Sequence, residues 1–332
     1  MSLCKKGFLI VVCVFIAGSC FNNADRDNPL DPNSDNYQAS GELQGFVYTY
    51  YAPFQPIAAA KITLLPGFQI TSTGASGQFF LKNITPGDYL VTVAFEGYAP
   101  DTVSIQIEPN KIASLQFNLD GLPRLESLSL TSGTEHNYYL ADPNQYLNCT
   151  VAVSDPDGLA DIASVAMVIP QFGFKDTLAV SQLIGSYQIM YQESDLPFQN
   201  IEELLGEEVY MELSDKAGKS QRFGPYFLAR IINEQPIAVA PVANAQVIGK
   251  PAFSWQEIIP PFAFTFKIEI YLVIASQVIF PPRKTISNIS SEIYTYQLSE
   301  ILDAGQYLWI ISIVDKWGNW SRSTPATFQV IK

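Results

Sequence analysis

One short pattern occurs twice in the second half of this chain. An apolar segment runs into DKAGKS at 215–220, another runs into DKWGN at 315–319, and a further strand-like segment follows each copy. Asp and Gly in this arrangement are typical of a tight turn between two strands. The interval from Asp215 to Asp315 is about 100 residues, the length of one β-sandwich domain. The repeat therefore predicts two tandem sandwiches, at residues 122–233 and 234–332.

The composition also favours strands over helices. Hydrophobic residues make up 48% of the chain and charged residues 15%, and the chain contains 20 Gly and 22 Pro. This mixture suits short strands joined by tight turns, and no long amphipathic pattern of helical period occurs. We therefore expect an all-β protein, with at most a short helical turn near Leu204 and Leu205.

Residues 41–121 have the pattern of a third, smaller sandwich. Ile62 and Leu64 alternate with polar residues, Pro86-Gly87 forms a turn signal, and the stretch after it alternates again. The landmarks Gly45, 58–64, 77–79, 83–89 and 97–98 together resemble the carboxypeptidase regulatory-like domain, a transthyretin-like sandwich. The resemblance implies a non-catalytic module that lacks the zinc site of carboxypeptidases.

The two later modules also resemble known families. PAFSWQ (251–256), FKIEI (266–270) and GQYLW (305–309), with the 315–321 turn, resemble a fibronectin type III domain. VAVSDPDGLADIASV (151–165) and the Asp215 turn resemble a bacterial immunoglobulin-like domain. These resemblances imply three tandem sandwiches of the transthyretin-like, immunoglobulin-like and fibronectin type III-like kinds.

The N-terminus has the features of an export signal. Lys5 and Lys6 precede an apolar run of about 13 residues, which is too short to cross a bilayer as a helix and is typical of a signal peptide. The run ends in AGSC, which resembles the lipobox of bacterial lipoproteins. The resemblance implies that residues 1–19 are removed and that Cys20 carries acyl chains such as palmitate. Ordinary secretion, with cleavage nearby, is the alternative.

The residues after Cys20 suit a membrane tether. Residues 20–40 are polar, acidic and contain two Asp/Asn-Pro turns, which is typical of a flexible spacer. Phe21, rather than Asp, follows the cysteine, which favours the outer membrane over the inner. We therefore expect a lipid-anchored protein of the bacterial cell envelope, facing the periplasm or the exterior.

One acidic segment offers ligands for a metal ion. In SDPDGLADI, Asp155, Asp157 and Asp161 supply hard oxygen ligands of the kind that Ca²⁺ prefers. The helix pair and twelfth-position acid of an EF-hand are absent, and Asp-Pro-Asp-Gly also forms a turn without any metal. A structural Ca²⁺ site and a plain turn both remain open; we expect no other cofactor.

Several aromatic residues are candidates for ligand binding. Trp317 and Trp320 flank a turn, where they could bind a ligand or fold back over the edge of the sandwich. Tyr48, Tyr50 and Tyr51 lie in FVYTYYAPF, either as a small binding patch or as an ordinary strand edge. Trp255 and Trp309 lie within strands and are expected in the core.

The sequence argues against catalysis and against binding of nucleic acid. His136 is the only histidine, it lies in a loop-like stretch without a nucleophile motif, and no Gly-rich phosphate-binding motif occurs. Cys149 alternates with apolar residues, as expected of a buried thiol. The formal net charge of −13 disfavours contact with phosphate backbones.

These features predict a non-catalytic envelope lipoprotein that acts in binding or scaffolding. Interaction with envelope proteins, or adhesion, is the first hypothesis, because sandwich modules often serve as spacers and docking platforms. Carbohydrate binding, as an accessory to glycan capture, is the alternative, and the turn tryptophans and the tyrosine cluster support it.

Overall fold

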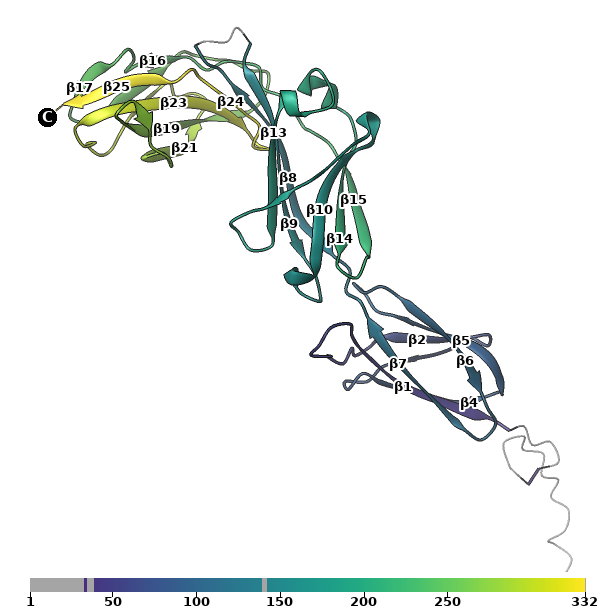
Figure 1. Cartoon of the computed structure of the whole chain (residues 1–332). Coiled ribbons are helices and arrows are strands. Elements are labelled where there is room, and N and C mark those ends of the chain that lie inside the picture. Colours follow the sequence, from purple (N-terminus) through teal and green to yellow (C-terminus); the bar gives the residue numbers. More distant parts are fainter. Residues whose placement is uncertain (1–32, 35–38, 139–141, 332) are drawn as a thin grey trace, which may run out of the picture. The chain divides into compact units, whose positions relative to one another are not determined.

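In the described part of the chain, the regular structure consists almost entirely of β-strands (Figure 1). The computed structural model describes residues 33–34, 39–138 and 142–331. The predicted all-β class is confirmed. One compact unit ends at Gly121 and another begins at Leu122. Cys20 and most of the expected tether lie outside the described residues. Among the described residues, no helix has the length and apolarity needed to cross a bilayer.

The first module, residues 41–121, is a sandwich of a three-stranded and a four-stranded sheet. The sheet orders are β4-β1-β7 and β3-β2-β5-β6. Strand β1 is central in its sheet, antiparallel to β4 and parallel to β7. The strands are β1 (Gly41–Thr49), β2 (Lys61–Leu65), β3 (Gln69–Ser72), β4 (Gln78–Ile84), β5 (Gly87–Ala94), β6 (Asp101–Ile107) and β7 (Ile112–Leu119).

Alternation along these strands fills the core of the first module. Ile62 and Leu64 of β2 face Val91 and Val93 of β5, and all four side chains are buried. In β1, Leu43 and Val47 point into the same core, whereas the even-numbered residues between and beside them point outward. Period-two alternation therefore leaves one face of the β4-β1-β7 sheet uncovered within its own module.

The middle module, residues 122–233, has its own core. Its strands are β8 (Arg124–Glu135), β9 (Asn144–Ser154), β10 (Ile162–Ile169), β11 (Phe174–Thr177), β12 (Ala179–Val180), β13 (Ser186–Gln192), β14 (Val209–Asp215) and β15 (Ser220–Tyr226). Among the described residues of this module, four 3₁₀ turns lie between the strands: η1 (Leu159–Asp161), η2 (Pro170–Phe172), η3 (Glu193–Asp195) and η4 (Ile201–Leu204). The last of these is the short helical turn expected near Leu204.

The C-terminal module, residues 234–332, packs around aromatic side chains. Trp255 and Trp309 are buried in its core, as expected, with Phe253, Phe266 and Phe328. Its strands are β16 (Ala238–Ala240), β17 (Ala245–Ile248), β18 (Ala252–Trp255), β19 (Phe264–Ile274), β20 (Gln277–Val278), β21 (Lys284–Ser290), β22 (Thr295–Gln297), β23 (Gly305–Asp315), β24 (Trp320–Arg322) and β25 (Ala326–Ile331).

The repeated sequence pattern forms the same turn in both modules. In each copy the Asp carboxylate accepts the backbone N–H four residues on, from Lys219 to Asp215 at 2.7 Å and from Asn319 to Asp315 at 3.0 Å. The glycine of each copy has a positive φ, 89° at Gly218 and 93° at Gly318. A side chain is disfavoured in that conformation, which explains why both copies place Gly there.

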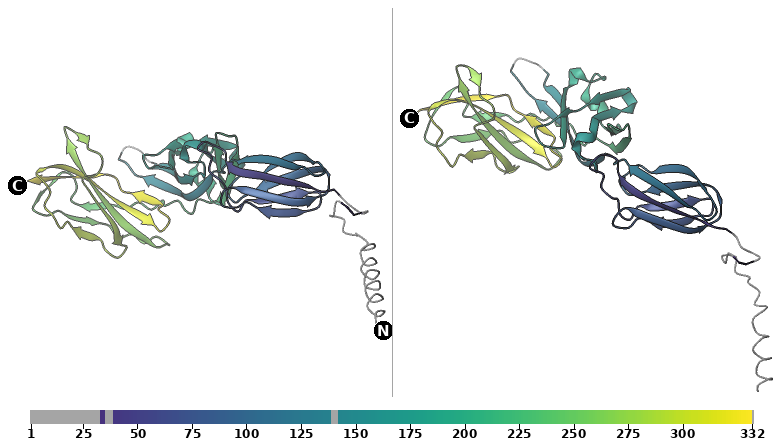
Figure 2. Two further views of the ribbon diagram at one scale, coloured as in Figure 1. Left: turned by 90° about the horizontal axis from the view of Figure 1, so that it is seen from below. Right: turned by 60° about the horizontal axis from the view of Figure 1, so that its bottom comes forward.

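A strand pairing joins the middle and C-terminal modules into one continuous sheet. Strand β24 pairs in parallel with the end of β8, so that Trp320, Ser321 and Arg322 lie beside 133–135. Both views in Figure 2 show the green and yellow strands of the C-terminal module adjoining the teal middle module. Backbone hydrogen bonds across the boundary resist bending between these modules.

Candidate functional site

The outward face of the β4-β1-β7 sheet carries amide and aromatic side chains. We call it the amide–aromatic face, and its members are Gln44, Phe46, Tyr48, Gln78, Phe80, Ser114, Gln116 and Asn118. Phe46 is 36% exposed and Phe80 is 49% exposed, although large aromatic side chains are usually buried. An exposed patch of this kind is a common sign of a binding surface.

Strand register sets the arrangement of this face. Gln44 lies opposite Phe80, and Phe46 lies opposite Gln78, so rings and amides alternate across β1 and β4. The rings of Phe46 and Tyr48 are stacked, with centroids 5.9 Å apart and planes at 10°. On the β7 side, the Gln44 amide donates to the Ser114 hydroxyl at 3.2 Å. These contacts hold flat rings and polar amides in fixed positions along one surface.

The amide–aromatic face is nearly free of charge. Within the three described strands the charged residues are Glu42 and Lys82, which lie toward the same end of the sheet. Between that end and Tyr48 every outward group is an amide, a hydroxyl or a ring. The face is therefore suited to a ligand that offers hydroxyl groups and apolar surface rather than charge.

The loop after β1 extends the aromatic surface. Pro56 bridges to Tyr48, and the Thr49 hydroxyl accepts the N–H of Gln55 at 2.9 Å, which closes the loop onto the strand end. Within it the rings of Tyr50 and Tyr51 meet edge to face at 5.0 Å. Tyr50, Tyr51 and Phe54 are 46%, 38% and 53% exposed.

The structure thus brings the three tyrosine candidates together and adds residues that sequence reasoning missed. Tyr48 lies on the amide–aromatic face, and Tyr50 and Tyr51 lie on the adjoining loop. Phe46 was detectable, since ELQGFVY alternates polar or aromatic residues with apolar ones. Phe80 and Gln116 could not be identified from the sequence, because only the pairing of β1 with β4 and β7 places them beside Phe46.

The acidic segment of the middle module folds as a tight turn followed by η1. The Asp155 carboxylate accepts the N–H of Asp157 at 2.8 Å, and the Gly158 N–H bonds to the Asp155 carbonyl at 2.9 Å. The Lys216 N–H donates to the carbonyl of Asp161 at 2.9 Å, which joins the segment to the end of β14. Asp215, which sequence reasoning did not include among these candidates, directly precedes Lys216 and ends β14 beside this segment.

Burial and neighbouring carboxylates act on the proton affinity of Asp155. The pKa of Asp155 is raised to about 6, first by burial and then by the charges of Asp161, Asp157 and Asp215, against a lowering by the Asp157 N–H. Concentrated negative charge of this kind is unfavourable unless a cation compensates it.

Both turn tryptophans lie at the boundary between the middle and C-terminal modules. Trp320 stacks on Tyr146, with centroids 6.2 Å apart, and covers Gly133, where a Cβ would come within 2.2 Å of the indole. Trp317 is 47% exposed, and its ring lies 5.3 Å from the Arg230 guanidinium. Trp320 is thus occupied by packing, whereas Trp317 keeps about half of its surface open.

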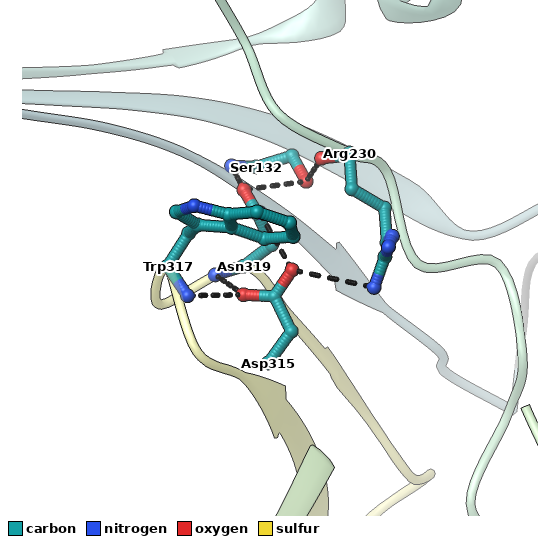
Figure 3. Close-up of polar contacts among 5 residues, drawn as sticks. All are labelled: Ser132, Arg230, Asp315, Trp317 and Asn319. Carbon is teal, nitrogen blue, oxygen red and sulfur yellow. Dashed lines mark hydrogen bonds and ion pairs between the residues drawn. The ribbon is translucent and has the colours of Figure 1, made fainter. Parts of the chain in front are cut away.

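A buried polar network lies beside the Trp317 ring (Figure 3). The Asn319 amide oxygen accepts the Ser132 N–H at 2.8 Å, and its NH₂ group donates to Asp315 at 2.9 Å. The Ser132 hydroxyl donates to the Arg230 carbonyl at 2.8 Å, and the Arg230 guanidinium lies 3.8 Å from the Asp315 carboxylate. Asn319 is fully buried. We call this set the junction network.

The single histidine, His136, and the cysteine of the middle module, Cys149, both lie in partly or fully buried surroundings. His136 lies 3.4 Å from the buried Ser321 hydroxyl, and burial lowers the pKa of its ring. Cys149 is buried in the core of the middle module, as predicted, and burial raises the pKa of its thiol to about 12. A protonated, enclosed thiol is a poor nucleophile.

A shallow apolar depression of about 440 Å³ lies on the other sheet of the first module. Few polar groups converge on it, whereas small-molecule sites usually combine apolar walls with several polar contacts. Its lining residues are Leu65, Pro66, Phe68, Asp88, Tyr89, Leu90 and Ser104. The amide–aromatic face is therefore the stronger candidate.

Comparison with known protein families finds a match in the first module. Residues 42–120 match the carboxypeptidase regulatory-like domain. The match covers nearly the whole of the first module. A search of curated protein sequences finds no match to the chain.

Several solved structures are similar to the chain at low sequence identity. The major pilin subunit BcpA of Bacillus cereus has 8% identity and a TM-score of 0.30, over 88% of this chain and 95% of that one. The FN1–FN3 domains of chicken CNTN1 have 11% identity and a TM-score of 0.30, over 89% and 96%. A minor pilin of Streptococcus agalactiae has 16% identity and a TM-score of 0.24, over 27% of this chain and 48% of that one. This chain thus spans about half of the Streptococcus pilin chain, and likeness at these levels says nothing of function.

Proposed function

We propose that this chain is a lipid-anchored, non-catalytic binding protein of the bacterial cell envelope, and that its amide–aromatic face captures a neutral polysaccharide. The observation that carries the proposal is the chemistry of that face. A sugar ring has an apolar face that packs on an aromatic ring and hydroxyls that both donate and accept hydrogen bonds. Phe46, Tyr48 and Phe80 supply rings, and Gln44, Gln78 and Gln116 supply amides, which donate and accept.

The low charge of the amide–aromatic face favours a neutral glycan over a protein partner or an acidic polymer. A protein partner would usually meet a mixed surface with charged residues at its rim. An acidic polymer would need cationic contacts, and Lys82 is the one cationic residue of the three described strands. A nearly uncharged face of amides and aromatic rings suits an extended neutral chain better than either.

Binding to neutral glycans is expected to depend on the two exposed rings of the face. We expect Phe46→Ala combined with Phe80→Ala to weaken retention on a responsive glycan about tenfold or more, about 1.4 kcal/mol at least. The measurement is affinity electrophoresis of lipid-free protein, residues 21–332, in gels containing cellulose derivatives, xylan, mannan or amylose. Polygalacturonate serves as the acidic comparison.

The matched control for this test is Phe68→Ala. Phe68 is 76% exposed and belongs to the same module, but it lies beyond β2 near the other sheet. The Phe68→Ala substitution should leave retention on the glycan gel unchanged. The glycan proposal fails if no neutral glycan retards the wild-type protein. If, in addition, the wild-type protein captures an envelope protein and the Phe46→Ala, Phe80→Ala variant does not, the face is a protein-docking surface.

A second role, as a stiff scaffold, is favoured by two features of the boundary between the middle and C-terminal modules. The β8–β24 pairing and the junction network fuse the middle and C-terminal modules through backbone bonds and buried polar contacts. Freely jointed modules would not need such a boundary. We propose that residues 122–332 act as one rigid body that serves as a spacer or docking platform for envelope partners.

Anchoring is expected to depend on Cys20. Cys20→Ser removes the sulfur that would be acylated, so we expect loss of radioactive palmitate labelling and release of the protein from the membrane fraction, since buried acyl chains supply most of the membrane affinity. Cys149→Ser is the matched control, because that thiol is buried in a core. Labelling that persists in Cys20→Ser would refute lipidation at this residue.

A further inference from the structure

One end of the first module receives the chain from the N-terminal residues. The Ser40 carbonyl, directly before β1, accepts the N–H of Asn110 at 2.9 Å, in the turn between β6 and β7. Gly87, the first residue of β5, pairs with Ile107 of β6, and an added Cβ at Gly41 would meet the Ile107 side chain at 2.4 Å. The beginnings of β1 and β5 and the β6–β7 turn therefore share one end of the sandwich. We call it the entry end.

The turn of the β2–β3 hairpin also lies at the entry end. Leu65, the last residue of β2, pairs with Leu90, so residues 66–68 continue toward the beginning of β5. Phe68 and Asp88 both line the apolar depression of about 440 Å³. The hairpin turn thus lies beside the first residues of β5.

Apolar side chains are exposed around this hairpin. Phe68 is 76% exposed, Ile70 56% and Leu90 46%, and Pro66 is exposed as well. We call these four residues the entry patch. The φ of Phe68 is 52°, in the left-handed region that turns usually give to Gly or Asn. The turn geometry therefore disfavours a large aromatic residue here, and exposed apolar patches commonly mark binding surfaces.

The position of the proposed lipid anchor identifies the surface that the entry patch meets. Residues 21–40 separate Cys20 from β1, and a chain of this length spans at most about 70 Å when fully extended. An anchor at Cys20 therefore ties the module to the bilayer by its entry end. We propose that the entry patch inserts into the interfacial region of that bilayer, an inference that rests on the proposed lipid anchor.

The chemistry of the entry patch suits a lipid interface. Its four members are apolar, and Asp88 is the charged residue among those that line the depression. Binding at a membrane surface gains from apolar area that is buried at the boundary between headgroups and acyl chains. A stable protein interface, by contrast, uses about 20–30 residues on each side, many more than this hairpin and the neighbouring strand provide.

The lipid anchor allows so small a patch to bind. Once acyl chains hold the protein at the membrane, insertion of the patch is an intramolecular step with a high effective concentration. The contact then holds the entry end against the bilayer, instead of leaving the module at any distance that residues 21–40 permit. The amide–aromatic face belongs to the other sheet, so glycan capture does not depend on this contact.

The direct test places a tryptophan in the entry patch of the full, lipid-anchored chain. Phe68→Trp keeps an aromatic ring in the hairpin turn. The native tryptophans, at 255, 309, 317 and 320, all lie outside the first module, so the wild-type fluorescence can be subtracted. In vesicles of phosphatidylcholine brominated on its acyl chains, we expect the added fluorescence to be quenched, and in unbrominated vesicles we expect it to be shifted to the blue.

Phe54→Trp is the matched control for the fluorescence test. Phe54 is 53% exposed in the loop that follows β1, at the end of the module opposite the entry end. Its added fluorescence should be the same in brominated and unbrominated vesicles. Equal quenching of Phe68→Trp and Phe54→Trp, or quenching of neither, would overturn the inference.

A second measurement does not require the anchor. Lipid-free protein, residues 21–332, should co-sediment with phosphatidylcholine vesicles at about 5 mM lipid, well above the ~0.1 mM at which a single myristoyl chain is half bound. Phe68→Ser combined with Leu90→Ser should lower the partition coefficient about tenfold or more, whereas Phe54→Ser should bind like wild type. Because the contact is apolar, about 0.5 M NaCl should leave wild-type binding unchanged.

Failure of the anchor and failure of insertion are distinguishable. If Cys20 carries no palmitate, the anchor fails, and the partition of the lipid-free protein alone decides whether the patch binds lipid. If the lipid-free protein forms a dimer that Phe68→Ser and Leu90→Ser dissociate, and it does not bind vesicles, the patch is an interface between copies of this chain and the inference is overturned.

Discussion

Asn319→Ala is expected to lower the thermal midpoint of the 122–332 unit by roughly 6–12 °C. The Asn319 side chain is fully buried and joins Ser132 of the middle module to Asp315 of the C-terminal module. Its removal leaves a buried N–H and a carboxylate oxygen without these partners, at a cost of about 3 kcal/mol in total. For a unit of this size, about 2–4 °C is lost per kcal/mol.

The matched control is Lys219→Ala, at the equivalent position of the other turn. The Lys219 side chain is exposed, and its contribution to the turn is the backbone N–H, which alanine retains. Scanning calorimetry should show a near-normal midpoint for Lys219→Ala and a lower or split transition for Asn319→Ala. A wild-type midpoint in Asn319→Ala would mean that the junction network does not couple the two modules, and the rigid-scaffold role would lose its support.

Gly45→Val is expected to unfold the first module. A Cβ at Gly45 would lie 2.4 Å from the Leu115 carbonyl oxygen and 2.6 Å from the Phe79 ring. Both neighbours are held in strands that flank β1, so neither can move far, and overpacking at the centre of the sheet should cost about 3 kcal/mol or more. The variant should lose glycan capture although no side chain of the amide–aromatic face is changed.

Gly74→Ala is the control for this prediction. The nearest atom to a Cβ at Gly74 is the Gln78 carbonyl oxygen at 3.8 Å, an ordinary contact. The Gly74→Ala substitution should leave the stability of the first module unchanged or raise it slightly, since alanine lowers the conformational entropy of the unfolded chain. Near-UV circular dichroism and limited proteolysis would report the fold of the first module in both variants. Resistance to proteolysis in Gly45→Val equal to that of wild type would contradict the prediction.

Local pattern was enough to predict the strands and turns. The inward positions Ile62, Leu64, Val91 and Val93 could be read directly, because a strand with one buried face must alternate. The two Asp–Gly turns were likewise readable, since the side chain of Asp and the positive φ of Gly act within five residues. Trp255, Trp309 and Cys149 were placed in cores for the same reason.

The candidate sites were readable only in part. Tyr48, Asp155, Asp157 and Asp161 stand out in the sequence, but their partners come from distant segments. Phe80 joins Phe46 only through the β1–β4 register, and Asp215 joins the 155–161 segment only through the β10–β14 register.

The amino-acid sequence by itself determined the all-β class, the carboxypeptidase regulatory-like module and the repeated turn, because each depends on short-range alternation and turn chemistry. Only the tertiary structure decided what the two copies of the turn do. Asp315 meets an amide and a guanidinium at a module boundary, whereas the second oxygen of Asp215 is buried without a hydrogen-bond partner in the described chain. The same five-residue geometry thus forms part of a module boundary in one place and leaves a buried carboxylate oxygen without a hydrogen-bond partner in the other, since the partners of a buried charge are set by strand pairing across long stretches of chain.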